Sequence, residues 1–151
     1  MDLKKLAAAL IPDGDLVSPE KYENIYPERN REPKAEVTRL APSPTGFIHL
    51  GNLYSALADE RCAHTTGGTF YLRIEDTDEK RKVDGAVESV IRSLKYFGID
   101  FDEGAEIESR QNIYGPYYQR QRAKMYKSFV KKLIEEGRAY PCFCTEDELN
   151  A

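Results

Sequence analysis

The chain has 151 residues, of which 40% are apolar and 32% charged, and its formal net charge is −4. This composition is typical of a globular domain and excludes a surface that is basic throughout, as a general binder of nucleic-acid backbones would need. The chain has no apolar run of the roughly 20 residues that a bilayer span needs and no secretory signal, so we expect a cytoplasmic protein without a membrane partner.

Residues 1–34 are predicted to form a helical amino-terminal extension without chemistry of its own. Leu3, Leu6 and Leu10 have helical spacing, and the sequence Pro-Asp-Gly that follows ends this helix. A second short helix is expected after Ser18, which is a suitable N-cap, because Pro19 then takes the first helical position.

The rest of the chain alternates between predicted strands and helices. In chain order we expect a strand at 35–41, a helix at 50–65, a strand at 69–74, a helix from a cap at Asp84 to Gly98, a short extended piece at 98–104, a helix at 117–136, a brief strand at 138–141 and a helix capped by Thr145. This order predicts an α/β fold with parallel strands and helical crossovers. Such sheets bind ligands outside the carboxyl ends of their strands.

The first strand-to-helix junction, RLAPSPTGFIHLGN at residues 39–52, carries unusual backbone constraint. Its two prolines stiffen the loop, Gly46 permits a conformation that other residues resist, and the start of the following helix favours a phosphate. His49 and Asn52 share a face if the helix begins near Ile48, and both can donate hydrogen bonds to phosphate oxygens. Gly51 leaves room for a base or ribose. The alternative is a proline-rich turn with a structural histidine.

Two further patterns have both a functional and a structural interpretation. Lys124, Lys127, Lys131 and Lys132 could form a local positive face, although a solvated helix face is the favoured interpretation. Cys142 and Cys144 form a Cys-x-Cys pair, which supplies half of the four ligands of a structural zinc site. Two packed thiols are the favoured alternative for the chain as it stands. An odd total of three cysteines argues against a disulfide framework.

Four blocks of the sequence together resemble glutamyl-tRNA synthetases, a family of class I aminoacyl-tRNA synthetases. RLAPSPTGFIHLGN resembles the HIGH-motif region, GGTFYLRIEDTDEKR the GGxFxLRIEDTDxxR block, YFGIDFDEG the LGLDWDEG block, and YGPYYQRQRAKMYKSFVKKLIEEGRAYPCFCTEDEL the segment that ends in CFCTxEEL. The resemblance spans residues 37–151. It implies the amino-terminal half of a Rossmann-like catalytic domain at 35–141 and the start of an acceptor-binding insertion at 142–151.

The resemblance also implies roles for individual residues. Arg39 would pair with a carboxylate of the substrate glutamate, Glu75 would hold its α-ammonium, and Ala41 and Ser43 would line the amino-acid pocket. His49 and Asn52 would act on the ATP phosphates, with Thr45, Gly46 and Gly51 completing the ATP site and Mg²⁺ accompanying the nucleotide. Arg81 would contact the tRNA end or remain a surface cation. Asp76 and Asp78 are expected to be structural, capping amides of the turn.

The predicted function is activation of L-glutamate by ATP and its transfer to the 3′ end of tRNA-Glu, by an enzyme that we expect to be monomeric at full length. The alternatives are the synthetase paralogue that attaches glutamate to queuosine in tRNA-Asp, and a non-catalytic tRNA-binding module. Two departures from the family pattern are Asn52 in the last HIGH position and Arg120 in place of the usual serine. The family's KMSKS-type loop lies outside these residues, so we expect the chain alone not to charge tRNA.

Overall fold

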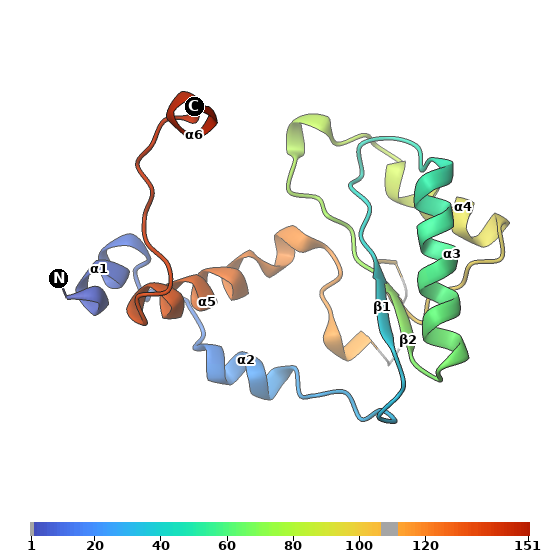
Figure 1. Cartoon of the computed structure of the whole chain (residues 1–151), viewed down its shortest axis with the longest axis horizontal. Helices are drawn as coiled ribbons and strands as arrows, with labels where there is room; N and C mark the ends of the chain where they lie inside the picture. Colours follow the sequence, from blue (N-terminus) through green and yellow to red (C-terminus); the bar gives the residue numbers. More distant parts are fainter. Residues whose placement is uncertain (1, 107–111) are drawn as a thin grey trace. The chain divides into compact units, whose positions relative to one another are not determined.

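The computed structural model describes residues 2–106 and 112–151 (Figure 1). The chain divides into two compact units, one formed by residues 26–122 and the other by the residues up to Ile25 together with 123–151. This division groups residues 123–141 with the amino-terminal segment, whereas the sequence placed them in the catalytic half. The functional boundaries at residues 34 and 141 stay predictions. No described helix is long and apolar enough to span a membrane.

The larger unit is built on a parallel sheet with the order β1-β2-β3, where β1 is Val37–Leu40, β2 is Thr69–Leu72 and β3 is Glu103–Gly104. Val37 pairs with Thr69 and Leu40 with Leu72, and Tyr71 on the other side of β2 pairs with Glu103. The predicted α/β class with parallel strands is therefore confirmed. Because the strands are parallel, their carboxyl ends lie at one edge of the sheet.

Two helices make the crossovers between these strands: α3 (Leu50–Thr65) follows β1 and α4 (Ala86–Tyr96) follows β2 (Figure 1). Successive side chains of a strand alternate between the two faces of the sheet, so one face carries the apolar side chains of the strands. These pack with both helices in a core that includes Leu40, Leu53, Ala56, Phe70, Leu72, Ile74, Val90 and Leu94. Arg39 and Tyr71 lie on the opposite face, which is less covered.

The turn between α3 and β2 depends on two adjacent glycines. Gly67 has a φ of 71°, in the left-handed region that follows many helix ends. A Cβ on Gly68 would lie 1.8 Å from the carbonyl oxygen of Glu36, so no larger residue fits where the turn passes the start of β1. The prediction that this pair closes the helix is confirmed.

The second unit contains α1 (Leu3–Leu10), α2 (Pro19–Ile25), α5 (Ala123–Glu135) and α6 (Glu146–Asn150). Both α1 and α2 pack on α5. The predicted caps are confirmed at Ser18, which accepts from the Lys21 N–H, and at Thr145, which forms a capping box with Glu148. Three of the four α5 lysines pair with acids, in the pairs Lys124–Asp15, Lys131–Asp13 and Lys132–Glu20. The favoured interpretation of a solvated helix face holds for Lys124 and Lys127, which are exposed, but not for Lys131, whose side chain is 11% exposed.

Several predicted elements are wrong in detail. The helix expected from residue 117 begins at Ala123 after a 3-10 turn at Gln119–Arg122, because Tyr117 and Gln119 bond instead to the backbone of Ile74. Asp84 does not cap α4; the cap is Gly85, with a φ of 76°. Residues 138–141 form no strand with any described residue, because Arg138 N–H and Ala139 N–H bond back to the Leu133 carbonyl at the end of α5.

Two further 3-10 turns belong to the larger unit, at Glu79–Arg81 and Asn112–Tyr114. The first lies in the loop between β2 and α4, where Asp78 caps it by accepting from the Arg81 N–H at 3.2 Å.

Candidate active site

The loop between β1 and α3 is held in place by backbone hydrogen bonds to the next loop of the sheet. The Glu75 N–H donates to the Pro42 carbonyl at 3.0 Å, and the Val83 N–H donates to the Pro44 carbonyl at 2.9 Å. Within the loop, Gly46 has a φ of 147°, a conformation that L side chains rarely adopt. The proline-framed loop therefore has a defined backbone and meets the segment after β2.

The loop ends at the amino terminus of α3, where His49 is the N-cap residue. Its side chain makes no capping hydrogen bond, and the N–H groups of Leu50 and Gly51 have no hydrogen-bond partner among the described residues. The helix begins at Leu50 as expected, so a start near Ile48, the condition for His49 and Asn52 to share a helix face, is not met. His49 therefore lies just outside the first turn. A helix start with free N–H groups is suited to binding an anion.

Gly51 is packed against His49. A Cβ at this glycine would lie 3.3 Å from Nδ1 of the His49 ring, closer than most side-chain contacts. The glycine thus leaves room for the imidazole beside the first turn of α3. Approach of a base or ribose to Gly51, as the sequence suggested, stays a prediction.

A cavity of about 220 Å³ lies between this loop and α3. Its lining comprises Pro42, Ser43, Thr45, Gly46, Phe47, Ile48, His49, Asn52 and Val90. The structure thus brings together five of the predicted site residues: Ser43, Thr45, Gly46, His49 and Asn52. Arg39, Ala41, Gly51 and Glu75 do not line it. Ser43, expected in the amino-acid pocket, thus lies with the nucleotide residues, while Glu75 is linked to the cavity through its backbone bond to Pro42.

A cluster of charges lies at the carboxyl ends of β1 and β2, with Arg39 inside β1 and Arg73 and Glu75 after β2. Nη1 of Arg39 and Nη2 of Arg73 both donate to Oε1 of Glu75, each at 3.2 Å. The three side chains lie on one face, because Arg39 is in register with Tyr71, and Arg73 and Glu75 follow Tyr71 at intervals of two residues. Nearby, burial raises the pKa of Asp59, an effect that the Arg39 charge partly offsets. The sequence prediction missed Arg73.

The same face carries a buried ion pair further from this edge. Arg29 donates two hydrogen bonds to Glu103, at 2.5 and 2.6 Å, and the Tyr117 hydroxyl donates to the same carboxylate. Burial alone would raise the pKa of Glu103, but the bonds from Arg29 and Tyr117 outweigh it and lower that pKa. Burial and the bond to Glu103 raise the pKa of Tyr117 well above its usual range. The extension residue Arg29 is thereby bound to β3.

The acidic loop after β2 is held by its own residues and by Arg120. Asp78 accepts from the Arg81 N–H, which confirms the expected cap within the turn. Asp76 is structural as expected, but it accepts from the Arg120 N–H at 2.9 Å and not from an amide of the turn. Nε of Arg81 also donates to Asp78 at 2.6 Å, and this bond lowers the pKa of the Asp78 carboxyl. Arg120, which departs from the family pattern, pairs with Glu79.

Cys142 and Cys144 are exposed free thiols in the second unit. Among residues 2–106 and 112–151, no group of three or more His, Cys, Asp or Glu side chains could hold a metal ion. A zinc site that includes these two cysteines stays a prediction.

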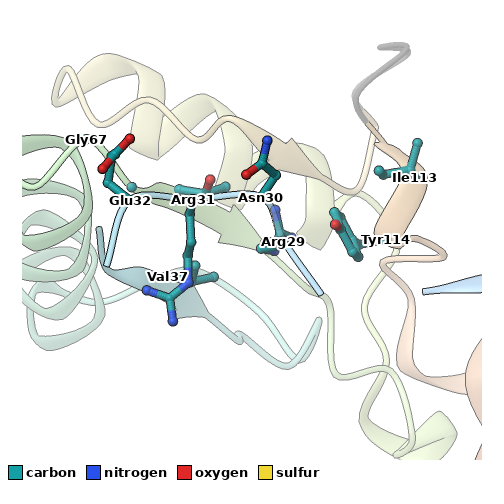
Figure 2. A pocket seen from close by; sticks show the side chains of 10 residues that line it. Arg29, Asn30, Arg31, Glu32, Val37, Gly67, Ile113 and Tyr114 are labelled. Carbon is teal, nitrogen blue, oxygen red and sulfur yellow. The ribbon is translucent and has the colours of Figure 1, made fainter. Parts of the chain in front are cut away.

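A larger cavity, of about 530 Å³, lies at the amino ends of β1 and β2 and includes Val37, Gly67 and Thr69 in its lining (Figure 2). Figure 2 shows Arg29 beside Tyr114, whose ring centroid is 3.9 Å from the Arg29 guanidinium carbon. Arg29 is bound to Glu103, and Arg31 donates to the Ala35 carbonyl. Both cations are engaged by the chain itself, and the cavity contains none of the predicted site residues.

Comparison with known proteins gives a consistent result over almost the whole chain. Residues 36–151 match the family model described as tRNA synthetases class I (E and Q), catalytic domain. The chain is 59% identical over 150 residues to a glutamate–tRNA ligase of Acetivibrio thermocellus, covering 99% of this chain and 27% of that protein. It is 50% identical over 152 residues to a Clostridium perfringens glutamate–tRNA ligase, covering 100% of this chain and 28% of the relative.

Solved structures give the same picture. The crystal structure of glutamate-tRNA synthetase from Elizabethkingia anophelis matches with a TM-score of 0.68 and 38% identity, over 77% of this chain and 23% of that one. A glutamate tRNA ligase from Elizabethkingia meningosepticum, solved in complex with its amino acid, matches with a TM-score of 0.67 and 39% identity, over 78% of this chain and 22% of the other. The chain spans a little over a quarter of the length of the curated relatives that it matches.

Proposed function

Since the chain belongs to the catalytic-domain family of the class I tRNA synthetases for glutamate and glutamine, we propose that it is part of a glutamate–tRNA ligase. In this function ATP activates L-glutamate, and the glutamyl group then passes to the 3′ end of tRNA-Glu. The observation that carries the proposal is the placement of the His49 cavity next to the Arg39–Glu75 pair at one edge of a parallel sheet.

The charged cluster suits an amino acid with two carboxylates and one ammonium. The planar guanidinium of Arg39 can bind a glutamate carboxylate with two parallel hydrogen bonds, and Glu75 can accept from the α-ammonium. Ser43 can donate its hydroxyl to the same substrate, beside Ala41. These assignments place opposite charges of the protein against opposite charges of glutamate.

The cavity at the start of α3 suits the phosphates of ATP. Leu50 and Gly51 offer free N–H groups, and His49, Asn52 and Thr45 offer side-chain donors around Gly46. Mg²⁺ would accompany the nucleotide, held mainly by its phosphate oxygens, and would offset their charge. The substrate α-carboxylate attacks the α-phosphorus and pyrophosphate leaves. An ionised carboxylate needs no general base, so the protein contributes positioning and charge stabilisation.

The remaining assignments concern partners. Arg81 would contact the acceptor end of tRNA, in competition with its bond to Asp78. Cys142 and Cys144 would supply two ligands of a zinc site. As a translation enzyme, the protein would act in the cytoplasm, and we expect a monomer.

A hybrid ligase tests this function. The chain would replace the corresponding 150-residue segment of the Acetivibrio thermocellus relative, and exchange between ATP and labelled pyrophosphate would be measured with glutamate and tRNA. We expect glutamate-dependent exchange, and a loss of about 10²–10³-fold in His49→Ala. His64→Ala, at the other end of α3, is the matched control and should keep most of the activity. A folded hybrid without glutamate-dependent exchange would refute the proposal.

A further inference from the structure

We propose that Arg73 is a positioning residue, which holds Glu75 in the orientation that binds the α-ammonium of glutamate while Arg39 binds a carboxylate. This inference rests on the proposed function and extends it to a residue that the sequence analysis did not assign. Arg73 precedes Glu75 by two residues, just after β2.

The backbone of residues 73–75 is fixed from both sides. The Arg73 N–H donates to the Leu40 carbonyl at 3.0 Å and the Glu75 N–H to the Pro42 carbonyl at 3.0 Å, which continues the β1–β2 ladder. On the other side, the Ile74 N–H donates to the Tyr117 carbonyl at 2.9 Å. With the backbone held in this way, the position of the Glu75 carboxylate depends on its side-chain rotamer and therefore on what its oxygens bind.

Arg73 is the more sheltered of the two cations on that carboxylate. Its side chain is 19% exposed, against 36% for Arg39, and Glu75 itself is 32% exposed. Its Nε atom is buried without a hydrogen-bond partner among the described residues. A guanidinium in this setting has less access to water than Arg39, so its contact with Glu75 is the more persistent of the two.

The two arginines share one oxygen of Glu75 and leave the other available. Oε1 accepts from both Arg39 and Arg73, whereas Oε2 accepts no hydrogen bond from any described residue. A substrate carboxylate competes with Glu75 for the donors of Arg39. Arg73 then keeps Oε1 in place, and Oε2 remains free to accept from the α-ammonium. Without Arg73, no arginine would hold the Glu75 carboxylate once Arg39 binds the substrate carboxylate.

This division of roles predicts a change in selectivity rather than a general loss of binding. Glutarate has the two carboxylates of glutamate but no ammonium. Its binding therefore depends on Arg39 but not on the contact between Glu75 and the α-ammonium. Methionine is of similar length to arginine and uncharged. Replacing Arg73 with methionine should weaken the binding of glutamate but not the binding of glutarate. If the role of Arg73 were purely structural, the substitution would weaken the binding of both ligands alike.

The test uses the hybrid ligase and its glutamate-dependent exchange, with glutarate as a competitive inhibitor. In Arg73→Met we expect the KM for glutamate to rise about tenfold or more, as for loss of a charge-assisted hydrogen bond, with the glutarate inhibition constant within about twofold. Arg73→Lys, which keeps the charge, should restore part of the difference. Arg92→Met, an exposed arginine on α4, is the control. Thermal unfolding shows whether each variant is folded.

A double-mutant cycle isolates the coupling to Glu75 even if Arg73→Met is less stable. Because Arg73 acts through Glu75, adding Arg73→Met to Glu75→Gln should change the KM for glutamate less than about twofold. An equal loss of glutamate and glutarate binding, an unchanged KM in Arg73→Met, or a full additional effect in the Glu75→Gln background would overturn the inference. These outcomes differ from failure of the proposed function, in which the parent hybrid itself shows no glutamate-dependent exchange.

Discussion

Arg39 and Glu75 are 36 residues apart in the sequence and form an ion pair, with 3.2 Å between Nη1 and Oε1. The parallel register of β1 and β2 brings them together, because each lies near the carboxyl end of its strand. The residues proposed to bind the two charged ends of glutamate therefore also bind each other. In the proposed function, substrate would exchange this pair for its own contacts, which would keep the charges balanced before and after binding.

This pair is predicted to matter for substrate binding and little for stability. Both side chains are about one-third exposed, and ion pairs of this kind contribute about 0–1 kcal/mol. We expect Arg39→Met and Glu75→Gln to leave the free energy of unfolding within about 1 kcal/mol of the parent in urea titrations. The same variants should raise the KM for glutamate in the exchange assay about tenfold or more. A large loss of stability would instead indicate a structural pair.

Gly51→Ala is predicted to separate activity from stability at the start of α3. Alanine has the higher helix propensity, so the substitution should not destabilise the helix, but its Cβ would lie 3.3 Å from Nδ1 of His49 and displace the ring. We expect a loss of exchange activity of about tenfold or more with an unchanged or higher melting temperature. Ser55→Ala, on an exposed position of the same helix, is the control. Unchanged activity would show that the position of the His49 ring is unimportant.

Arg29→Met is predicted to destabilise the larger unit. It removes two hydrogen bonds from Glu103, whose side chain is 8% exposed, and leaves a buried carboxylate with only the Tyr117 hydroxyl. Loss of one partner of a buried pair costs about 3 kcal/mol or more, which urea titration can measure. Arg31, in the same segment, donates to the Ala35 carbonyl and pairs with no carboxylate among the described residues, so Arg31→Met should cost less stability. Equal effects of the two variants would contradict this account.

The same carboxylate predicts how stability depends on pH. The pKa of Glu103 is lowered from its ordinary value of 4.5, so its contribution to stability is present above that pH and is lost as the pH falls through the folded-state pKa. We expect the free energy of unfolding to decrease below about pH 5, and Glu103→Gln to make this decrease shallower. A parallel pH dependence in parent and variant would show that Glu103 does not contribute to it.

Local sequence signals predicted the bounds of α3 correctly. The bounds of α3 are 50–65 as expected, because helical spacing, the loop before it and Gly67–Gly68 after it all agree. The helix expected at 117–136 started too early because apolar spacing continues through Tyr118, while the backbone there is drawn to Ile74. Nothing local to residues 117–119 signals that long-range pairing.

The sequence predicted most residues of the candidate site but not which of them lie together. The motifs named His49, Arg39 and Glu75, yet the structure puts His49 on one cavity and the other two in an ion pair beside it. Arg73 was missed, although its spacing of two from Glu75 on a strand already puts both on one face. The Arg29–Glu103 pair joins residues 74 apart, and no spacing rule connects them.

The most direct test of the central claim is glutamate-dependent exchange between ATP and pyrophosphate by the hybrid ligase and its variants. The account predicts activity in the parent and in His64→Ala, a loss of about 10²–10³-fold in His49→Ala, and a raised KM for glutamate in Glu75→Gln. Exchange that is unaffected by both His49→Ala and Glu75→Gln would contradict it.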